Sequence, residues 1–579
     1  MIQLQEISKS FGQRVLFSEV NIVLGPKERV GLVGRNGMGK STLFKIIEGY
    51  ESADAGHIAI PKGYSLGSLE QHLNFTGKTI LAEVVQALPK ELIYDHWRAE
   101  KILFGLGFGQ EDLDRAPSEF SGGYQIRVKL AKVLVSAPSL LLLDEPTNYL
   151  DIVSLRWLSQ FLKDFDGEVL VITHDRAFMD DVCTHIMGIH RKRVKKVSGN
   201  TKKYYEQLEA DEEVYELTRL NQERKKKELE GFIEKFSAQA SKARQANSKK
   251  KIIEKMDEIE TLEEIAELRF SFNYQDIPSK FPFEAKDLSF GYGDSEDLFN
   301  ELSFAAGKGD CIGIIGKNGK GKSTLLNVIA EELKLRSGDL WKAPGTLEGH
   351  FGQTNIERLH PQNTVVQEIL GVNDELSATA VRGICGSMMF SGDDADKSVS
   401  VLSGGEKARV MLGKILAKKT NLLYLDEPTN HLDLESIEVL CDEIAKFKGC
   451  VFLVTHSELL LSRLVNKLII FREGKANFFE GTYQDFLEKV GWDDELPEKV
   501  KKEKVIEKKT PKKEKTSVNE HKVLEIEQEI IRLEQMISKF ENLCQVKSSQ
   551  GEEIREITDT LLKLHEKVDE KFLELESLV

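Results

Sequence analysis

Two short apolar runs in this 579-residue chain predict strands that are buried on both faces of a sheet. The runs span residues 140–143 and 422–425, where apolar residues occupy successive rather than alternate positions. Each run ends in a pair of carboxylates, Asp144 and Glu145 in the first and Asp426 and Glu427 in the second. Because α/β sheets bind ligands at the carboxyl ends of their strands, we expect both pairs to line a ligand crevice.

The remaining pattern predicts the same α/β unit twice. Alternating apolar and polar residues over the first 33 positions indicate short antiparallel strands, whereas residues 80–108 read as helical. Further apolar runs, at 169–172 and 451–455, each lead to a histidine, His174 and His456. Because the motifs recur in the same order and at the same spacing, we interpret the chain as a duplicated α/β domain.

A glycine-rich loop joins a buried strand to a helix in each half. Both loops read G-x-x-x-x-G-K-S, a motif whose backbone N–H groups wrap the phosphates of a nucleoside triphosphate. Lys40 and Lys322 would reach the outer phosphates, and the hydroxyls of Ser41 and Ser323 would bind Mg²⁺, which prefers oxygen ligands. The loops are Gly34, Arg35, Asn36, Gly37, Met38, Gly39, Lys40, Ser41 and Thr42, and Gly316, Lys317, Asn318, Gly319, Lys320, Gly321, Lys322, Ser323 and Thr324.

Two further local features suit a nucleotide. A Ser-Gly-Gly turn opens a helix in each half, and the free N–H groups and dipole at such a helix N-terminus attract anions. These turns are Ser121-Gly122-Gly123 and Ser403-Gly404-Gly405. Phe11 and Tyr292 lie on turns near the start of each half, where an aromatic ring could stack on adenine or could simply pack at the edge of the core.

Composition narrows the class of protein. The chain is 40% hydrophobic and 30% charged with a net charge of −15, which suits a soluble protein and argues against a general nucleic-acid coat protein. Its six cysteines include no C-x-x-C pair, which argues against a zinc or iron–sulfur site and against a disulfide framework. This cysteine usage fits a protein of the reducing cytosol. No apolar run approaches the roughly 20 residues that span a bilayer. Strand-like alternation begins at once, so we expect no signal peptide.

Residues 199–281 break the α/β pattern and predict two antiparallel helices that join near residues 240–248. No acidic residue occurs between Lys235 and Lys251, although the protein is acidic as a whole. The bases at the predicted tip include Lys242, Arg244, Lys249, Lys250 and Lys251. A charge run is often only a solvated face, but bases that gather at the tip of a lever suit contact with the phosphates of RNA.

The two halves resemble ATP-binding cassette nucleotide-binding domains. The resemblance rests on the phosphate loop, Gln71, the Ser-Gly-Gly turn, the carboxylate pair, Leu150-Asp151 and His174 in this order. The second half repeats the set with Gln353 and Leu432-Asp433, and the resemblance covers nearly all of residues 1–490. Tyr124 departs from the usual Gln or Glu after the two glycines, and we expect this change only to tune the site.

The resemblance implies a role for each motif residue, with ATP and Mg²⁺ bound in each cassette. Asp144 and Asp426 would hold Mg²⁺ through water, with Gln71 and Gln353 sensing the metal or the attacking water. Glu145 and Glu427 would polarise that water, and His174 and His456 would support the γ-phosphate. The cassettes would pair head to tail, so that each phosphate loop and carboxylate pair faces the Ser-Gly-Gly turn of the other half.

The connector, which includes Phe232-Ile233-Glu234-Lys235-Phe236, resembles the interdomain linker of the ABC-F family, whose members act on ribosomes. The implied fold is α/β, with two P-loop ATP-binding cassette domains in tandem, an α-helical hairpin linker and a C-terminal α-helical coiled-coil hairpin. The implied protein is a cytoplasmic ATPase that acts as a monomer with paired cassettes. Its linker tip would contact rRNA and tRNA, in translation or in protection of the ribosome from antibiotics.

We place the first cassette at residues 1–200, the helical linker at 201–281 and the second cassette at 282–490. A charged flexible linker at 491–520 and a coiled coil at 521–579 follow. Apolar stripes in the last segment predict a helical hairpin. It resembles the C-terminal domain of the Uup-type branch, which is credited with binding nucleic acid. The hairpin could equally serve packing or dimerisation, because its charges are mixed.

Two other functions compete with the ribosomal one. The ATPase subunit of a membrane importer with fused cassettes would need partner permeases, and it leaves the basic connector unexplained. A DNA-maintenance ATPase could bind DNA through its C-terminal coiled coil. An excision-repair type would need zinc-type cysteine pairs, and a chromosome-condensation type would split one cassette, whereas each half here is complete.

Overall fold

The structure, a computed structural model, describes most of the first of two units, Met1–Trp492 and Asp493–Val579. The described residues are 1–12, 14–69, 75–148, 150–236, 248, 268–293, 297–352, 356, 358–373, 376–430, 432–472, 475–492 and 567. Several predictions lie outside them: Gln71, Gln353, the tip residues Lys242, Arg244, Lys249, Lys250 and Lys251, the second linker helix, the charged linker beyond Trp492 and the C-terminal coiled coil.

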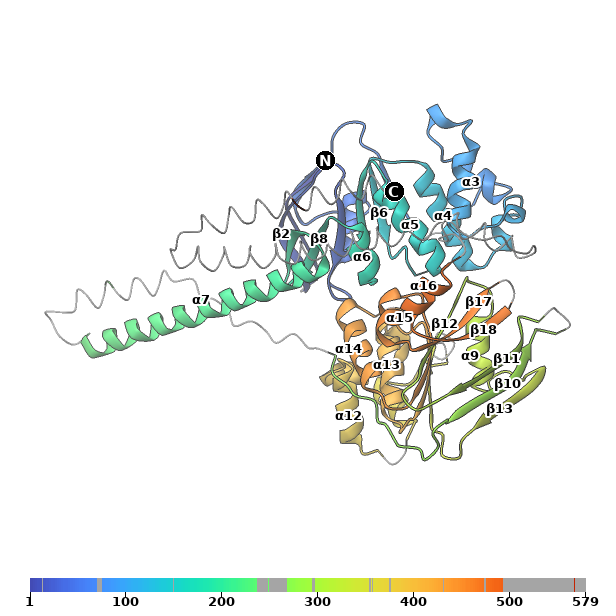
Figure 1. Cartoon of the computed structure of the whole chain (residues 1–579). Helices are drawn as coiled ribbons and strands as arrows, with labels where there is room; N and C mark the ends of the chain where they lie inside the picture. Colours follow the sequence, from blue (N-terminus) through green and yellow to red (C-terminus); the bar gives the residue numbers. More distant parts are fainter. Residues whose placement is uncertain are drawn as a thin grey trace. The chain divides into compact units, whose positions relative to one another are not determined.

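A six-stranded sheet forms the core of each cassette (Figure 1). The first has the order β5-β6-β7-β3-β8-β9 and the second the order β14-β15-β16-β12-β17-β18, with only the last strand of each antiparallel to its neighbour. The strands are β3 (Arg29–Val33), β5 (Leu66–Ser68), β6 (Leu140–Asp144), β7 (Glu168–Ile172), β8 (His185–His190), β9 (Arg193–Ser198), β12 (Cys311–Gly316), β14 (Glu348–Phe351), β15 (Leu422–Asp426), β16 (Cys450–Val454), β17 (Lys467–Arg472) and β18 (Lys475–Glu480). The predicted tandem of α/β cassettes is confirmed.

The apolar runs lie inside these sheets, as predicted. Every leucine of β6 is at most 1% exposed, and each such side chain contributes roughly 2 kcal/mol to folding when it is buried. In β15 the third position is Tyr424, which is also fully buried. Its hydroxyl donates to Oε1 of Glu348 at 3.0 Å, and this hydrogen bond allows a polar atom to sit at the centre of the sheet.

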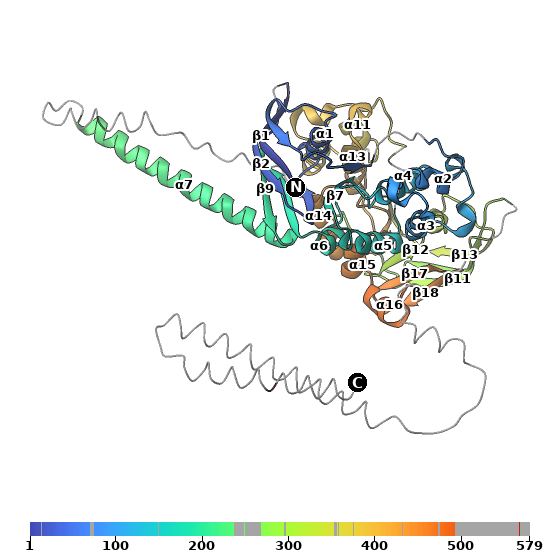
Figure 2. The ribbon, with the colours of Figure 1, turned by 90° about the horizontal axis from the view of Figure 1, so that it is seen from above.

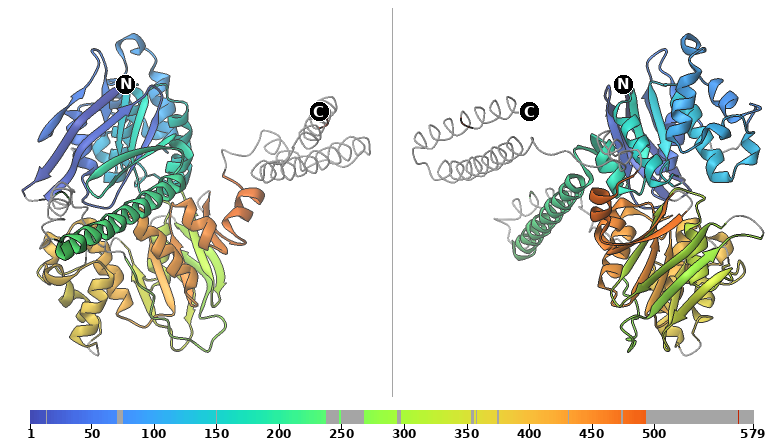
Figure 3. Two further views of the ribbon diagram at one scale, coloured as in Figure 1. Left: turned by 90° about the vertical axis from the view of Figure 1, so that its left-hand side faces the viewer. Right: turned by 45° about the vertical axis from the view of Figure 1, so that its right-hand side comes forward.

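A second, antiparallel layer packs on each core sheet, in the order β2-β1-β4 and β11-β10-β13 (Figure 3). Its strands are β1 (Ile2–Phe11), β2 (Arg14–Leu24), β4 (Ala55–Ala59), β10 (Phe283–Phe290), β11 (Phe299–Ala306) and β13 (Ser337–Lys342). The alternation at the start of the chain therefore predicts β1 and β2 correctly. Ile2 and Leu4 of β1 are buried against the core sheet, and after an irregularity in the pairing with β2, Ile7 is buried as well.

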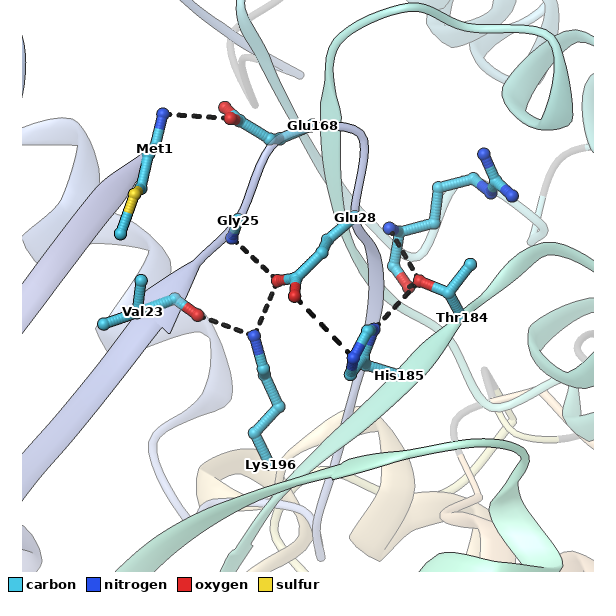
Figure 4. A network of polar contacts seen from close by, with 9 residues as sticks. Met1, Val23, Gly25, Glu28, Glu168, Thr184, His185 and Lys196 are labelled. Atoms are coloured by element: carbon cyan, nitrogen blue, oxygen red, sulfur yellow. Dashed lines mark hydrogen bonds and ion pairs between the residues drawn. The ribbon is translucent and has the colours of Figure 1, made fainter.

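Glu28 ties the antiparallel layer of the first cassette to its core sheet (Figure 4). Its carboxylate accepts hydrogen bonds from the backbone N–H of Gly25 at 2.8 Å and from Nζ of Lys196 in β9 at 2.6 Å. The same Nζ also donates to the carbonyl oxygen of Val23 in β2, at 2.6 Å. Burial raises the pKa of Glu28, but Lys196 and Gly25 outweigh it, so the net pKa lies below the ordinary value.

Helices cover the core sheets and form a separate helical layer. Those that follow the core strands are α1 (Lys40–Glu48), α5 (Ile152–Lys163), α6 (Arg176–Val182), α9 (Lys322–Ile329), α14 (Leu434–Lys446), α15 (Glu458–Leu464) and α16 (Tyr483–Lys489). The helical layers contain α2 (Ile80–Val85), α3 (His96–Gly105) and α4 (Gly122–Val135), and α11 (Val365–Leu370), α12 (Ala378–Ser387) and α13 (Gly404–Leu416). Figure 2 shows α2, α3 and α4 together, beside the core of the first cassette.

The helix expected over residues 80–108 is interrupted. It consists of α2 and α3 with a turn between them, where Pro89 precedes a short 3₁₀ segment, Lys90–Leu92. Proline disfavours the helical conformation of the residue before it, so a continuous helix cannot pass this point without strain.

The predicted first linker helix is present as α7 (Thr201–Phe236), which has 36 residues and is therefore about 54 Å long. Figure 1 shows it running out from the first cassette. Ion pairs at helical spacing, such as Arg219 with Glu216 and Glu223, stabilise its exposed part. Its first turns are different, because Tyr204 is only 3% exposed and packs with Val33 and Leu434.

Candidate functional site

The two phosphate loops hold their lysines in the same way. Lys40 is 8% exposed, and its Nζ donates to the carbonyl oxygens of Gly34 at 2.6 Å and Arg35 at 3.2 Å. Nζ of Lys322 likewise donates to the carbonyl of Gly316 at 2.9 Å. The glycine before each lysine, Gly39 in the first loop, has a left-handed backbone with φ 94° and caps the following helix. This conformation turns the loop back over the helix N-terminus.

A serine and an aspartate meet beside each lysine. The Ser41 hydroxyl hydrogen-bonds Asp144 at the end of β6, and Ser323 hydrogen-bonds Asp426 in the second cassette. Oδ1 of Asp426 is buried without a hydrogen-bond partner among the described residues. The oxygens of Ser323 and Asp426, one of them unsatisfied, could hold a hard divalent cation, and Ser41 and Asp144 occupy the same places in the first cassette.

Glu145 and Glu427 have strained backbones and buried carboxylates. Their φ values are 49° and 46°, in the left-handed region that non-glycine residues rarely adopt, at a cost of about 1–3 kcal/mol each. Burial, reinforced by the adjacent Asp144, raises the pKa of Glu145 to about 8. Burial and Asp426 do the same for Glu427, whose pKa is also about 8. Once ionised, a carboxyl group with such a pKa is a stronger base than an ordinary glutamate, as a group that activates water must be.

Each glutamate faces the histidine at the end of the neighbouring strand. Nε2 of His174 lies 3.2 Å from Oε1 of Glu145, and Nε2 of His456 lies 3.5 Å from Oε1 of Glu427. Burial, together with nearby Lys322, lowers the pKa of His456 to about 3, so its imidazole is neutral at physiological pH. The structure thus brings the glutamate and the histidine of each half together, although they are 29 positions apart in the sequence.

The two Ser-Gly-Gly turns open α4 and α13, as predicted, but their first turns differ. Ser403 and Glu406 form a reciprocal capping box, in which the Glu406 carboxylate accepts from the backbone N–H of Ser403 at 2.8 Å. Tyr124 replaces that glutamate in the first cassette. Its ring packs edge-on against Phe108 at 5.5 Å, so α4 begins on an aromatic cluster instead of a capping box.

The two candidate adenine-stacking rings are exposed. Phe11 is 51% and Tyr292 is 56% exposed, so neither belongs to the core. The hydroxyl of Tyr292 lies 3.2 Å from Oγ1 of Thr324, the last residue of its phosphate loop motif. Each ring therefore has a surface that a base could cover.

The cassettes meet through the aspartates that follow each carboxylate pair. Oδ2 of Asp151 accepts a hydrogen bond from the backbone N–H of Asn318 in the opposite phosphate loop, at 3.2 Å. Oδ1 of Asn318 in turn lies 2.9 Å from Nε2 of His456 and accepts from Nζ of Lys322 at 3.2 Å. In the other direction, burial lowers the pKa of Lys40, and the carboxylate of Asp433 from the second cassette is one of the nearby charges that oppose this shift.

Ion pairs flank these central contacts. Arg156 pairs with Glu458 at 2.6 Å, and Arg176 pairs with Glu438. A pocket between the cassettes is lined by residues of both, including His174 and His456. We call the cluster around Lys40, Ser41, Asp144, Glu145 and His174 site 1, and the cluster around Lys322, Ser323, Asp426, Glu427 and His456 site 2.

Comparison with known proteins identifies the family. A model of the ABC transporter family matches residues 17–148 and again 299–430, and a second ABC transporter model, for an extension, matches 187–272. The chain is 32% identical to the putative ATP-binding protein YdiF of Bacillus subtilis, with 84% of this chain and 83% of that protein covered. It is also 32% identical to ABC transporter F family member 2 of Arabidopsis thaliana, with 88% and 82% covered.

The chain belongs to the ABC-F family. ABC cassettes hydrolyse ATP, so this ABC-F chain is an ATPase. Within its described part, every helix is too short or too polar to cross a bilayer.

Solved structures share the tandem fold of this ABC-F chain. An archaeal ribosome recycling factor, crystallised with the ribosomal stalk protein aP1, superimposes with a TM-score of 0.58 at 19% identity, with 84% of this chain and 92% of that chain covered. The structure of an RNase-L inhibitor superimposes with a TM-score of 0.57 at 19% identity, with 84% of this chain and 93% of that chain covered. At this identity the likeness concerns the fold alone.

Two arginines of the ABC-F sites were not predicted from the sequence. Arg127 in α4 is 1% exposed, and its Nη1 lies 3.6 Å from Oδ2 of Asp151 while donating to the carbonyl of Leu106 at 2.9 Å. Burial raises the pKa of Asp151, but Arg127 and backbone N–H groups outweigh it and bring the net pKa below the ordinary value. Arg409 takes the equivalent place near Asp433. The sequence could have indicated these arginines, because one occurs four residues after Gly123 and another four residues after Gly405.

Proposed function

We propose that this ABC-F ATPase hydrolyses ATP at two composite sites and uses the resulting motion to act on ribosomes in the cytoplasm. The single observation that carries the composite sites is the hydrogen bond from the Asn318 N–H to Asp151, since it joins one phosphate loop to the aspartate of the other cassette. The proposal treats the protein as a monomer, because both halves of each site come from one chain.

In each site, the residues of this chain divide the reaction among them. The loop N–H groups and the lysine, Lys40 in site 1, bind and orient the phosphates. Glu145, buried at the end of β6 with its pKa near 8, takes the proton of the attacking water. His174, 3.2 Å from that carboxylate, supports the γ-phosphate and helps to hold the water in line. Site 2 uses Lys322, Glu427 and His456 in the same roles.

Mg²⁺ fits the oxygen donors beside each lysine. Ser41 and Asp144 would hold it in site 1, and Ser323 and Asp426 in site 2, with Gln71 and Gln353 as further candidates by resemblance. When bound, the ion neutralises charge on the phosphates. The exposed rings of Phe11 and Tyr292 would cover the adenine.

Binding of both nucleotides is expected to hold the cassettes together. In this proposal the loop of one cassette and the Ser121 or Ser403 turn of the other share each γ-phosphate, the turn acting as a helix N-terminus that binds an anion. Hydrolysis removes that shared group, so the cassettes separate and the linker between them moves.

The ribosome as target is supported by the charge of the linker and by the family. The predicted tip carries bases in a protein whose net charge is −15, so the tip can approach phosphates that the body repels. Proteins of the same tandem fold are described as an archaeal ribosome recycling factor and as ribosome-bound ABCE1. Within this proposal, the protein serves translation or antibiotic protection, and its linker tip contacts rRNA or tRNA.

The experiment is sedimentation of a variant that binds ATP without hydrolysing it. Glu145→Gln combined with Glu427→Gln should remain closed on its target and co-sediment with 70S ribosomes in ATP but not in ADP. A matched variant that also replaces Lys242, Arg244, Lys249, Lys250 and Lys251 by Glu should still bind ATP but leave the 70S fractions. Hydrolysis at the wild-type rate by the double variant would overturn the assignment of the glutamates. Migration with membranes, or with DNA through the C-terminal segment, would overturn the ribosomal target.

A further inference from the structure

The two ATP sites are related by the internal repeat, but their surroundings differ. Lys40 and Lys322, Glu145 and Glu427, and Asp151 and Asp433 are each separated by 282 positions, so residues of the phosphate loops and of the segments after the carboxylate pairs have definable counterparts. Comparison of counterparts shows which contacts belong to one site alone.

Site 1 has an ion pair between cassettes that site 2 cannot form. Nη2 of Arg35 in the first phosphate loop lies 2.5 Å from Oε2 of Glu435, two positions after Asp433. The counterpart of Arg35 is Lys317, also a base, but the counterpart of Glu435 is Val153, which has no charge. Val153 instead packs against the apolar core of the second cassette.

The same place is where the linker begins. Leu434, next to Glu435, belongs to a small apolar cluster with Tyr204 of α7 and with Val33, the residue before the phosphate loop. Tyr205 and Leu208, in the first turns of α7, pack against this cluster. The root of the linker therefore touches both the strand that leads into the first phosphate loop and the helix that carries Glu435.

Polar contacts fix this root. Nε of Arg176 donates to Oγ1 of Thr201, the first residue of α7, at 2.7 Å, and the guanidinium of Arg176 also pairs with Glu438 on α14. The backbone N–H of Thr201 donates to Asp180 at 2.7 Å. At site 2 the corresponding position after β18 begins α16, which has only seven residues.

We propose that Glu435 is a positioning residue that couples ATP site 1, and not site 2, to the linker. It acts through Arg35: the ion pair holds the first phosphate loop against α14, and α14 is held by the root of α7. A movement of the linker root thus changes how site 1 receives its nucleotide, whereas at site 2 the described residues include no ion pair equivalent to Arg35–Glu435. The inference rests on the proposed assignment of the two sites.

The test isolates each site with the single variants, since Glu427→Gln leaves site 1 active and Glu145→Gln leaves site 2 active. Adding Glu435→Val, the residue of the other half, should raise the KM for ATP of site 1 roughly two- to fivefold with a smaller change in kcat, as expected for a partly exposed ion pair. The KM of site 2 should stay unchanged. High salt should raise the site 1 KM of the wild type more than that of the Glu435→Val variant, because in the variant the screened ion pair is already absent.

Two further variants test the link to the helix and the symmetry argument. Leu208→Ala at the root of α7 should also change the KM of site 1 alone, and its effect should be non-additive with that of Glu435→Val. Val153→Glu, with Val153→Gln as its uncharged control, should make the KM of site 2 salt-sensitive. Melting curves establish that each variant is folded.

The outcomes separate the two hypotheses. If neither Glu145→Gln nor Glu427→Gln lowers turnover, the proposed function fails. The coupling of site 1 to the linker is overturned if Glu435→Val changes the KM values of both isolated sites equally, or changes neither. It is also overturned if the effects of Glu435→Val and Leu208→Ala on the KM of site 1 are additive.

Discussion

Replacing Glu145 by glutamine should make the protein more stable, and increasingly so as the pH rises. The wild-type carboxyl has a pKa of about 8 in the folded protein against 4.5 as an ordinary glutamate. Between these pH values the folded state keeps a proton that the unfolded state has lost, so the free energy of unfolding falls as the pH rises. The amide of glutamine has the same shape and no proton to lose.

The magnitude follows from the shift. Each pKa unit corresponds to about 1.4 kcal/mol, so ionisation linkage at Glu145 costs about 2 kcal/mol at pH 6 and about 4 kcal/mol at pH 8. From pH 6 to pH 8, the free energy of unfolding of the wild type should therefore fall by about 2 kcal/mol more than that of the variant. For a domain of this size, that difference corresponds to roughly 4–8 °C in Tm.

The assay is differential scanning calorimetry of wild type and Glu145→Gln at pH 6 and pH 8, in buffer with EDTA and without nucleotide. Glu427→Gln should behave in the same way for the second cassette, since the pKa of Glu427 is also about 8. Glu213→Gln, on an exposed position of α7, serves as the control and should leave the pH dependence of Tm unchanged. If Glu145→Gln melts with the pH dependence of the wild type, the carboxyl is not protonated in the folded protein and the argument from burial is wrong.

The other predictions concern the contacts between and beneath the sites. Asp151→Asn should slow hydrolysis at site 2, measured with site 1 inactivated, by about tenfold because a charge-assisted hydrogen bond to the opposite loop is lost; Asp433→Asn should instead slow site 1, and the reverse pattern would contradict the head-to-tail pairing. Arg127→Met should lower stability by about 3 kcal/mol, seen as a fall in Tm, because it leaves the buried charge of Asp151 without its partner. An unchanged Tm would show that Asp151 is compensated by its backbone hydrogen bonds alone.

The buried carboxylates illustrate a balance between stability and activity. Glu145 and Glu427 combine left-handed backbones, buried oxygens and raised pKa values, all of which oppose folding. The surrounding sheet strands, whose leucines are almost fully buried, provide the stability that holds them in place. Substitutions that relieve this strain should stabilise the chain and abolish turnover.

Much of this fold could be predicted from the sequence, because the residues that define it lie in short continuous motifs. The phosphate loops, the Ser-Gly-Gly turns and the acidic pairs are local motifs, and the apolar runs before them can only be buried strands. The division of residues 80–108 was predictable in principle from Pro89. Tyr124 marked a difference between the halves, although only the structure shows that it replaces a capping box by an aromatic cluster.

The amino-acid sequence by itself determined that two α/β cassettes each carry a phosphate loop, an acidic pair and a following histidine, since these depend on neighbours in the chain. Only the tertiary structure decided which residue of one cassette meets which site of the other. Asp151 reaches Asn318, and Arg35 reaches Glu435, 400 positions further along the chain. No local pattern encodes such pairs, because they arise when two separately folded sheets pack and bring distant charges within a few ångströms.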